Sequence, residues 1–276
     1  APGAFVMGSG GITVNTQGGN ARIPLALGST GNFTKSGAGR LRLSAANSYS
    51  GGTRVSGGVL EIEGASALGP GNVVVESAEL RAHADATLSG SIGTGIQLIS
   101  VSGNQTGVFS AAPNSTLTLE PLDFLLVSGS TLQIGSSGNT GTVLFQPTGA
   151  VALPGDAAIN VAAGTFQAGN SGVEFVTAIA ASTTVAAGAT LDFDDNLGSG
   201  GIRALYGAGT VQIGSNSSTN LVVNSGNFSG NIAGNGALVK ESSGTLVLSG
   251  PTAFIGGTTV NEGNLIVNGS LSFGLG

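Results

Sequence analysis

Residues 35–69 read KSGAGRLRLSAANSYSGGTRVSGGVLEIEGASALG, and residues 240–274 read KESSGTLVLSGPTAFIGGTTVNEGNLIVNGSLSFG. The two stretches align without a gap, so one pattern of turns and apolar runs occurs twice. The identical pairs are Lys35/Lys240, Gly39/Gly244, Leu41/Leu246, Leu43/Leu248, Ser44/Ser249, Gly51/Gly256, Gly52/Gly257, Thr53/Thr258, Val55/Val260, Gly58/Gly263, Leu60/Leu265, Gly64/Gly269 and Gly69/Gly274. Internal repetition of this kind predicts a stack of similar structural units.

A shorter period lies inside each copy, because Leu41 and Leu43 recur as Leu60 and Ile62 at a spacing of about 19 residues. Through most of the chain, apolar and polar residues alternate in short runs that end in Gly, Asn, Ser or Pro. This pattern is typical of half-buried strands bounded by turns, and no window has the spacing of a helix. We therefore predict an all-β solenoid with rungs of about 19–25 residues, or roughly 11–14 rungs in the whole chain.

Glycine is abundant, with 50 residues among 276. Inside a strand a glycine costs roughly 0.5–1 kcal/mol relative to alanine, so we expect the glycines at the corners where the coil turns. The apolar residues between them are expected to line the inside.

The shorter period also predicts which side chains are neighbours. It places Arg42 beside Glu61 in the first copy, and Val247 beside Ile266 in the second. Opposite charges in one copy and two aliphatic side chains in the other both suit a pair on adjacent parallel strands. The alternative is a coincidence between surface positions.

Composition excludes several classes of partner and site. Charged residues make up 8% of the chain, the net charge is −6, and the eight Lys and Arg residues are scattered singly. Without a basic stripe in the sequence, we predict neither nucleic acid nor an anionic membrane surface as a partner. The absence of cysteine excludes disulfides, thiolate metal sites and a cysteine nucleophile. No run approaches about 18 apolar residues, so we expect no membrane-spanning helix.

Two groups of residues could carry chemistry. His83 is the only histidine and lies between alanines, which favours a solvated surface residue. Asp192, Asp194 and Asp195 could hold Ca²⁺ or act as paired acids on a polysaccharide. A solvated face followed by an acidic turn explains these carboxylates more simply.

A third group is Glu120 and Asp123, which flank Pro121. A loop with solvated charges is favoured there over an acid/base pair. We therefore predict no catalytic residue, no metal site and no cofactor.

The block L-x-L-S-x-x-N-x-[YF]-x-G-G-T-x-V-x-x-G-x-L, at residues 41–60 and again at 246–265, resembles the passenger-associated β-strand repeat of bacterial autotransporters. Asn47 is replaced by Thr252 in the second copy, a departure from the motif. The resemblance implies a right-handed parallel β-helix with three short strands per rung. It also implies export to the cell surface or outside of a Gram-negative bacterium, and a C-terminal translocator barrel on the same polypeptide.

On this basis we expect residues 1–276 to be a single β-helical passenger fragment, with repeat copies at 35–69 and 240–274. The start at Ala1 lacks a signal-peptide pattern, which leads us to expect a longer parent protein. Both chain ends look uncapped, which predicts end-to-end self-association.

Two functions from different classes remain. The first is a structural scaffold that serves adhesion and passenger export, with host or bacterial surface molecules as partners. The alternative is a β-helix enzyme acting on polysaccharide. Aromatic residues are 5% of the chain, with no Trp and two Tyr, so few side chains could stack on sugars. A membrane β-barrel would need aromatic girdles and longer strands.

Overall fold

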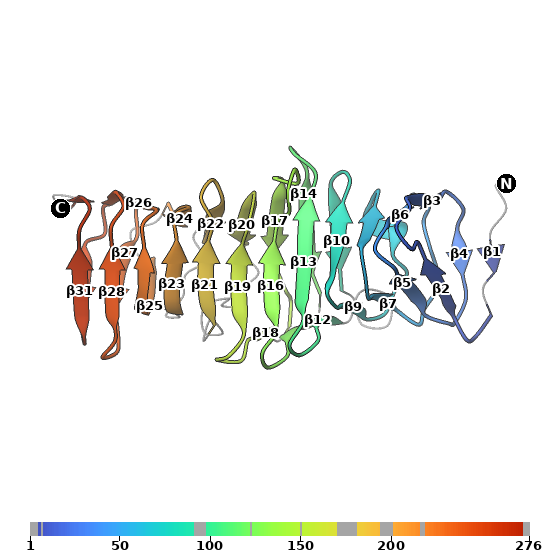
Figure 1. Cartoon of the computed structure of the whole chain (residues 1–276), viewed down its shortest axis with the longest axis horizontal. Coiled ribbons are helices and arrows are strands. Elements are labelled where there is room, and N and C mark those ends of the chain that lie inside the picture. The colour runs from blue at the N-terminus through green and yellow to red at the C-terminus, as the bar shows by residue number, and fades with distance from the viewer. Residues whose placement is uncertain are drawn as a thin grey trace.

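The protein is an elongated stack of short parallel strands with the two chain ends at opposite ends of one long axis (Figure 1). The computed structural model describes residues 5–6, 8–90, 98–121, 123–149, 151–169, 181–193, 201–215 and 219–272. Within these ranges the one helical element is the 3-10 turn η1 (Ala65–Ala67). The named strands pair in parallel along the stack, which confirms the predicted all-β parallel β-helix.

Three sheets of described strands form the faces of the stack. Face 1 contains β2 (Ile12–Asn15), β5 (Phe33–Ser36), β7 (Thr53–Val55), β9 (Val73–Val75), β12 (Leu98–Val101), β15 (Asp123–Leu126) and β18 (Val151–Ala152). Face 2 contains β3 (Ala21–Ile23), β6 (Arg40–Leu43), β8 (Val59–Ile62), β10 (Ala78–Ala82), β13 (Thr106–Ala111), β16 (Thr131–Ile134), β19 (Ala158–Val161), β21 (Ser182–Val185), β23 (Gly201–Gly207), β25 (Asn220–Phe228), β27 (Ala237–Lys240), β28 (Thr245–Leu248), β30 (Thr258–Val260) and β31 (Asn264–Val267).

Face 3 contains β11 (Ala86–Ser89), β14 (Thr116–Glu120), β17 (Thr142–Phe145), β20 (Thr165–Ala168), β22 (Thr190–Asp192), β24 (Thr210–Ile213), β26 (Asn231–Gly234), β29 (Thr252–Phe254) and β32 (Leu271–Ser272). A two-stranded sheet of β1 (Phe5–Val6) and β4 (Leu27–Gly28) lies near the N-terminus.

The long strand β25 turns a corner and so belongs to two faces. It pairs through Asn220–Val223 with β27 and through Gly226–Phe228 with β28. In the repeat alignment β27 and β28 match β5 and β6, which lie on faces 1 and 2. The 14-stranded sheet of face 2 therefore takes in strands of a second face in the C-terminal part of the stack.

The rungs differ in length more than predicted. Leu41 pairs with Leu60, which is the short rung expected from the repeats. Leu80 pairs with Phe109, and this rung is about half as long again. The upper limit predicted for the rung length was therefore wrong. The longer rungs explain why the stack has about 11 turns, at the lower end of the predicted range.

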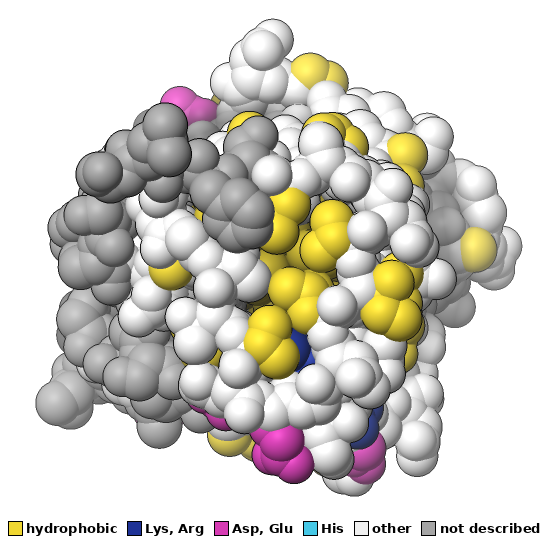
Figure 2. Space-filling model, turned by 90° about the vertical axis from the view of Figure 1, so that its left-hand side faces the viewer, with side chains coloured by type: hydrophobic (Ala, Val, Ile, Leu, Met, Phe, Trp, Pro, Cys, Tyr) yellow, Lys and Arg dark blue, Asp and Glu magenta, His cyan; other side chains and the backbone are white. Residues whose placement is uncertain are grey.

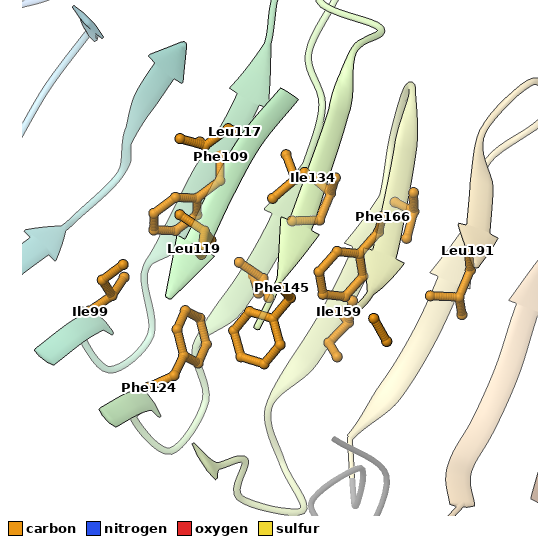
Figure 3. Packing of buried hydrophobic residues seen from close by; sticks show 14 of the residues in the cluster. Ile99, Phe109, Leu117, Leu119, Phe124, Ile134, Phe145, Ile159, Phe166 and Leu191 are labelled. Carbon is orange, nitrogen blue, oxygen red and sulfur yellow. The ribbon is translucent and has the colours of Figure 1, made fainter. Parts of the chain in front are cut away.

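The core consists of inward-facing side chains stacked along the axis. On face 2 one column runs in register from strand to strand through the buried side chains of Leu41, Leu60, Leu80, Phe109, Ile134, Val161, Val185, Phe228 and Leu248, with Gly207 between Val185 and Phe228. Figure 3 shows the aromatic part of the core between the faces. The rings of Phe124 and Phe145 meet edge to face at 4.8 Å, and those of Phe145 and Phe166 at 6.0 Å. Such pairs contribute about 0.5–1.5 kcal/mol each beyond their buried area.

The departure of Thr252 from the motif has a local explanation. In the first copy the corner at Asn47 is not a strand, and its side-chain amide adds hydrogen bonds to both neighbouring rungs beside the backbone bond from the Asn47 N–H to the Ser66 carbonyl at 2.8 Å. Asn47 Oδ1 accepts from the Leu27 N–H at 2.8 Å, and Nδ2 donates to the Ala67 carbonyl at 2.5 Å. Thr252 lies in β29, where its N–H and its hydroxyl both donate to the Ser270 carbonyl, at 2.9 Å and 2.7 Å. The threonine hydroxyl therefore keeps the side-chain bond to the next rung that the Asn47 amide makes in the first copy.

The C-terminal end of the described stack exposes side chains that interior rungs bury. Val260 in β30 matches the fully buried Val55, yet it is 48% exposed. Figure 2 looks onto this end and shows apolar side chains gathered at its middle. Among the described strands none pairs beyond β30, β31 and β32. In the part of the chain that the structure describes, no helix is long and apolar enough to cross a membrane.

Candidate binding surface

A buried lysine ties each repeat copy to its next rung. Lys35 lies at an inward position of β5 and is fully buried. Its Nζ donates three hydrogen bonds to backbone carbonyls: Ser36 at 2.8 Å, Gly37 at 2.7 Å and Gly57 at 2.9 Å. The first two acceptors follow the lysine directly, and the third lies 22 residues later. We call this arrangement the lysine clamp.

Lys240 forms the same lysine clamp in the second copy. It is also fully buried, and its Nζ donates to Glu241 at 2.7 Å, Ser242 at 2.6 Å and Glu262 at 3.0 Å, all through backbone carbonyls. The third acceptor is again 22 residues downstream. Two independent copies with one geometry indicate that the lysine is a structural part of the repeat.

The lysine clamp satisfies a buried charge with backbone dipoles. An ammonium group has three donors, and three carbonyls accept them. In register, Lys35 is stacked between Val14 and Val55, so its surroundings are otherwise apolar. Burial lowers the pKa of Lys35 from its ordinary value, because the charged form is desolvated.

The outer surface of face 2 carries a group of charged side chains, which we call the charged patch. Its members are Arg22, Arg40, Arg42, Glu61, Glu63, Glu79, Arg81 and His83. Arg22, Arg42, Glu61 and Arg81 form a row in register on four successive strands, β3, β6, β8 and β10. The fold therefore brings together residues that are far apart in the sequence.

Glu61 is the centre of the charged patch and is only 2% exposed. Four cationic or ionisable groups surround its carboxylate: Arg40 Nη1 at 3.1 Å, Arg42 Nε at 3.6 Å, Arg81 Nη1 at 3.7 Å and His83 Nδ1 at 3.7 Å. The predicted pairing of Arg42 with Glu61 is confirmed. Glu61 faces outward, as the alternation with Leu60 and Ile62 predicts, but the arginines cover it.

The pairing expected for the second copy is confirmed as well. Val247 of β28 is in register with Ile266 of β31. Both copies therefore have the short rung that the sequence predicts.

Glu79 extends the charged patch toward β13. Its carboxylate accepts hydrogen bonds from Arg81 at 3.0 Å, from Ser136 at 2.7 Å and from the buried Ser110. Burial alone would raise the pKa of Glu79, but hydrogen bonds from Arg81 and the two serines outweigh it. The pKa is held below its usual range, so the carboxylate stays charged.

Arg22, His83 and Arg40 are the most exposed groups of the charged patch, with side-chain exposures of 57%, 45% and 39%. Arg42 and Arg81 are 24% and 19% exposed, close to Glu63 at 26%, and Glu61 is covered at 2%. Four arginines against three glutamates leave one net positive charge on a protein whose total charge is −6. A ligand that approaches face 2 here meets guanidinium groups first.

The second repeat copy shows that the fold does not require this surface. Its side chains at the positions of Arg40, Arg42 and Glu61 are Thr245, Val247 and Ile266. The inward residues stay apolar or identical between the copies, with Phe254 at the position of Tyr49 and Val267 at that of Ile62, and both copies have the lysine clamp. The charged patch is therefore our candidate binding surface.

Sequence reasoning missed this surface because the arginines lie singly along the chain. The signal was present in the spacing, since Arg22, Arg42, Glu61 and Arg81 follow one another at intervals of one rung. That interval is the rung length already deduced from the repeats.

The other predicted positions are not brought into the charged patch, except His83. His83 lies at the surface, as expected, but it contacts Glu61. Asp192 lies in β22 beside a shallow hollow of about 340 Å³, which Gln212 and Ser215 also line. Asp194 and Asp195 lie outside the described residues.

Glu120 ends β14 on face 3, and Asp123 begins β15 on face 1. Within the described residues, no three His, Cys, Asp or Glu side chains are arranged to hold a metal ion.

Comparison with known proteins agrees with the repeat pattern. A family model described as "Passenger-associated-transport-repeat" matches residues 33–62 and 238–267. The chain carries two passenger-associated-transport repeats. The resemblance to autotransporter passengers is thereby confirmed, and each repeat contains one lysine clamp.

Outside the two repeats as well, this chain is similar to a known protein. Over 257 residues the chain is 30% identical to the "Adhesin BmaC autotransporter" of Brucella suis biovar 1 (strain 1330). The alignment covers 83% of this chain but only 7% of that relative's length. No solved structure matches the chain.

Proposed function

We propose that this chain is a β-helical scaffold within an autotransporter passenger, and that it presents adhesive surfaces outside a Gram-negative bacterium. The observation that carries the proposal is the contrast between the two repeats. Their inward positions stay largely apolar and their lysine clamps agree, while outer positions that are charged in one repeat are Thr245, Val247 and Ile266 in the other. A scaffold with freely changing outer residues suits a protein that serves recognition.

Similarity to the BmaC adhesin supports adhesion, with host or bacterial surface molecules as partners. The aligned part is a small share of that relative, so the activity of the whole protein is part of the proposal. We further propose that a C-terminal translocator barrel of the same polypeptide exports the passenger to the cell surface or the medium.

A role in export and folding is proposed for the repeats themselves. Each lysine clamp joins a corner to the next rung, so it stabilises newly formed coil as the chain is extended. We propose no enzymatic activity. The polysaccharide-cleaving alternative rests on Asp192, Asp194 and Asp195, and among the described residues Asp192 has no second carboxylate lining its hollow.

Surface display tests this proposal. The chain is placed between a signal peptide and a translocator barrel in a Gram-negative host, and protease accessibility and attachment to epithelial cells are measured. We expect a protease-resistant, surface-exposed product that increases attachment. The double variant Lys35→Met/Lys240→Met should lower the displayed amount, whereas Arg54→Ala should not, because Arg54 is an exposed surface residue. Retention of the wild-type chain inside the cell would contradict the export role, and display without attachment would contradict adhesion.

A further inference from the structure

The charged patch contains most of the ion pairs among the described residues and has no assigned ligand. Its row of arginines points to an anionic ligand. Arg22, Arg42 and Arg81 lie in one line along the axis, with Glu61 beneath the guanidinium groups. Adjacent strands are about 4.8 Å apart, so this row extends over about 14 Å. Arg40 adds a fourth cation beside the row. A linear ligand with repeated acidic groups matches such a row better than a single small anion does.

A hollow beside the charged patch offers groups for hydroxyls. It has a volume of about 270 Å³ and is lined by Glu63 and by small or polar residues such as Ser44 and Ser66. Glu63 can accept hydrogen bonds from hydroxyl groups, and serine side chains can both donate and accept. Arginine has five N–H donors, so Arg22 and Arg40, the most exposed arginines of the patch, can donate to carboxylates or sulfates beside their glutamate partners. We propose that the charged patch binds an acidic polysaccharide.

Two features favour a polysaccharide over nucleic acid. Single-stranded nucleic acid is usually held by aromatic side chains that stack on bases. Among the described residues the large exposed aromatic side chain is Tyr206, which lies on β23, away from the charged patch. The second feature is the hollow lined by Glu63, Ser44 and Ser66, whose oxygens can pair with the hydroxyl groups of a sugar.

This inference rests on the proposed adhesive function, because it names the ligand class of that function. Its test uses the purified chain and does not depend on export. Binding to immobilised heparin, a sulfated and carboxylated polysaccharide, is compared with binding to neutral dextran at about 0.15 M salt. We expect binding to heparin alone, which weakens as salt is raised.

Arg22→Ala and Arg54→Ala form a matched pair of variants. Arg22 and Arg54 are 57% and 56% exposed, and each pairs with one glutamate, Glu63 and Glu76 respectively. Both substitutions remove one positive charge, but only Arg22 belongs to the charged patch. We expect Arg22→Ala to weaken heparin binding about two- to fivefold, as the loss of one exposed ion pair would. Arg54→Ala should leave it unchanged.

Three results would overturn the inference. The first is absence of heparin binding by a folded wild-type chain. The second is an equal loss in both variants, which would mean that only the net charge matters. The third is equally tight binding of single-stranded DNA that Arg22→Ala also weakens, which would make the surface a general polyanion site. Each result leaves the display experiment unaffected, so the two proposals fail separately.

Discussion

The hydroxyl of Tyr49 lies 2.7 Å from the hydroxyl of Thr53, and both side chains are buried in the first repeat. The second repeat has Phe254 at the position of Tyr49, and there the hydroxyl of Thr258 is buried without a hydrogen-bond partner. One repeat therefore has a hydrogen bond that its counterpart lacks.

Phe254→Tyr is expected to stabilise the protein by about 1 kcal/mol, because it supplies the missing partner of Thr258. Chemical denaturation of the variant and the parent measures the difference. The same substitution in a Thr258→Val background is the control and should bring no gain. If Phe254→Tyr leaves the stability of the Thr258-containing protein unchanged or lowers it, the new tyrosine ring does not lie as the ring of Tyr49 does.

Ionisation of Tyr49 is expected to lower the stability of the protein at alkaline pH. Burial, the largest cause, raises the pKa of Tyr49 to about 12, although hydrogen bonds to Thr53 and Gly69 oppose it. In the unfolded chain the phenol loses its proton near pH 10, while the folded protein keeps it up to about pH 12. The folded state therefore binds more protons in this window, and stability falls as pH rises through it.

The expected loss is up to about 3 kcal/mol relative to Tyr49→Phe, which has no titrating group at this position. Stability curves of both proteins at intervals from about pH 9 to 12 measure it. Parallel curves across this window would contradict the prediction.

Lys35→Met is expected to destabilise the protein by about 2 kcal/mol, since buried polar groups left unpaired cost about 1–3 kcal/mol each. The substitution removes the desolvated charge but takes the lysine donor from three part-buried carbonyls, of which the Ser36 carbonyl still accepts from the Thr16 N–H. Lys240→Met repeats the experiment in the second lysine clamp and should give a similar value. Increased stability in both variants would show that burial of the ammonium costs more than its hydrogen bonds contribute.

Arg42 and Glu61 should be energetically coupled. A double-mutant cycle with Arg42→Ala and Glu61→Ala is expected to give a coupling of about 0.5–1 kcal/mol that weakens in salt, since Arg42 is 24% exposed. Glu61→Ala alone should cost about 2–3 kcal/mol, because it leaves several cations without their shared carboxylate. Additive effects without salt dependence would show that the two side chains act independently.

The apolar end of the stack predicts self-association at high concentration. Val260 faces inward and Ile266 outward on the last described strands, and both are nearly half exposed. Val260→Glu should abolish end-to-end association, because it places a charge in the stacking surface. Ile266→Glu is the matched control and should have a smaller effect. Sedimentation of both variants decides, and a wild-type chain that stays monomeric at millimolar concentration would contradict the prediction.

Local patterns were sufficient to predict the fold. Alternating residues such as Leu41 and Leu43, with glycines between the runs, determine strand, turn and inward face together. The longer rung between Leu80 and Phe109 was not predictable, because residues between strands can be added without disturbing the ladder.

The candidate site was only partly predictable. The spacing of Arg42 and Glu61 follows from the rung, but the burial of Glu61 depends on three arginines and a histidine from neighbouring strands. The sequence alone shows that both repeats have a lysine at the same position, Lys35 and Lys240. Their carbonyl partners were not, because sequence patterns carry no information about which backbone groups meet at a corner.

The lysine clamp makes the stability of each new rung depend on its register. Its third hydrogen bond forms only when the carbonyl of Gly57, 22 residues downstream, has reached its place above Lys35. A slip of one residue in the next strand would turn every side chain of that strand to the opposite face and move this carbonyl away from the ammonium group. A misaligned rung would then leave a buried cation short of one acceptor and would be selectively unstable. We propose that each repeat in this way disfavours a misaligned rung before further rungs are added.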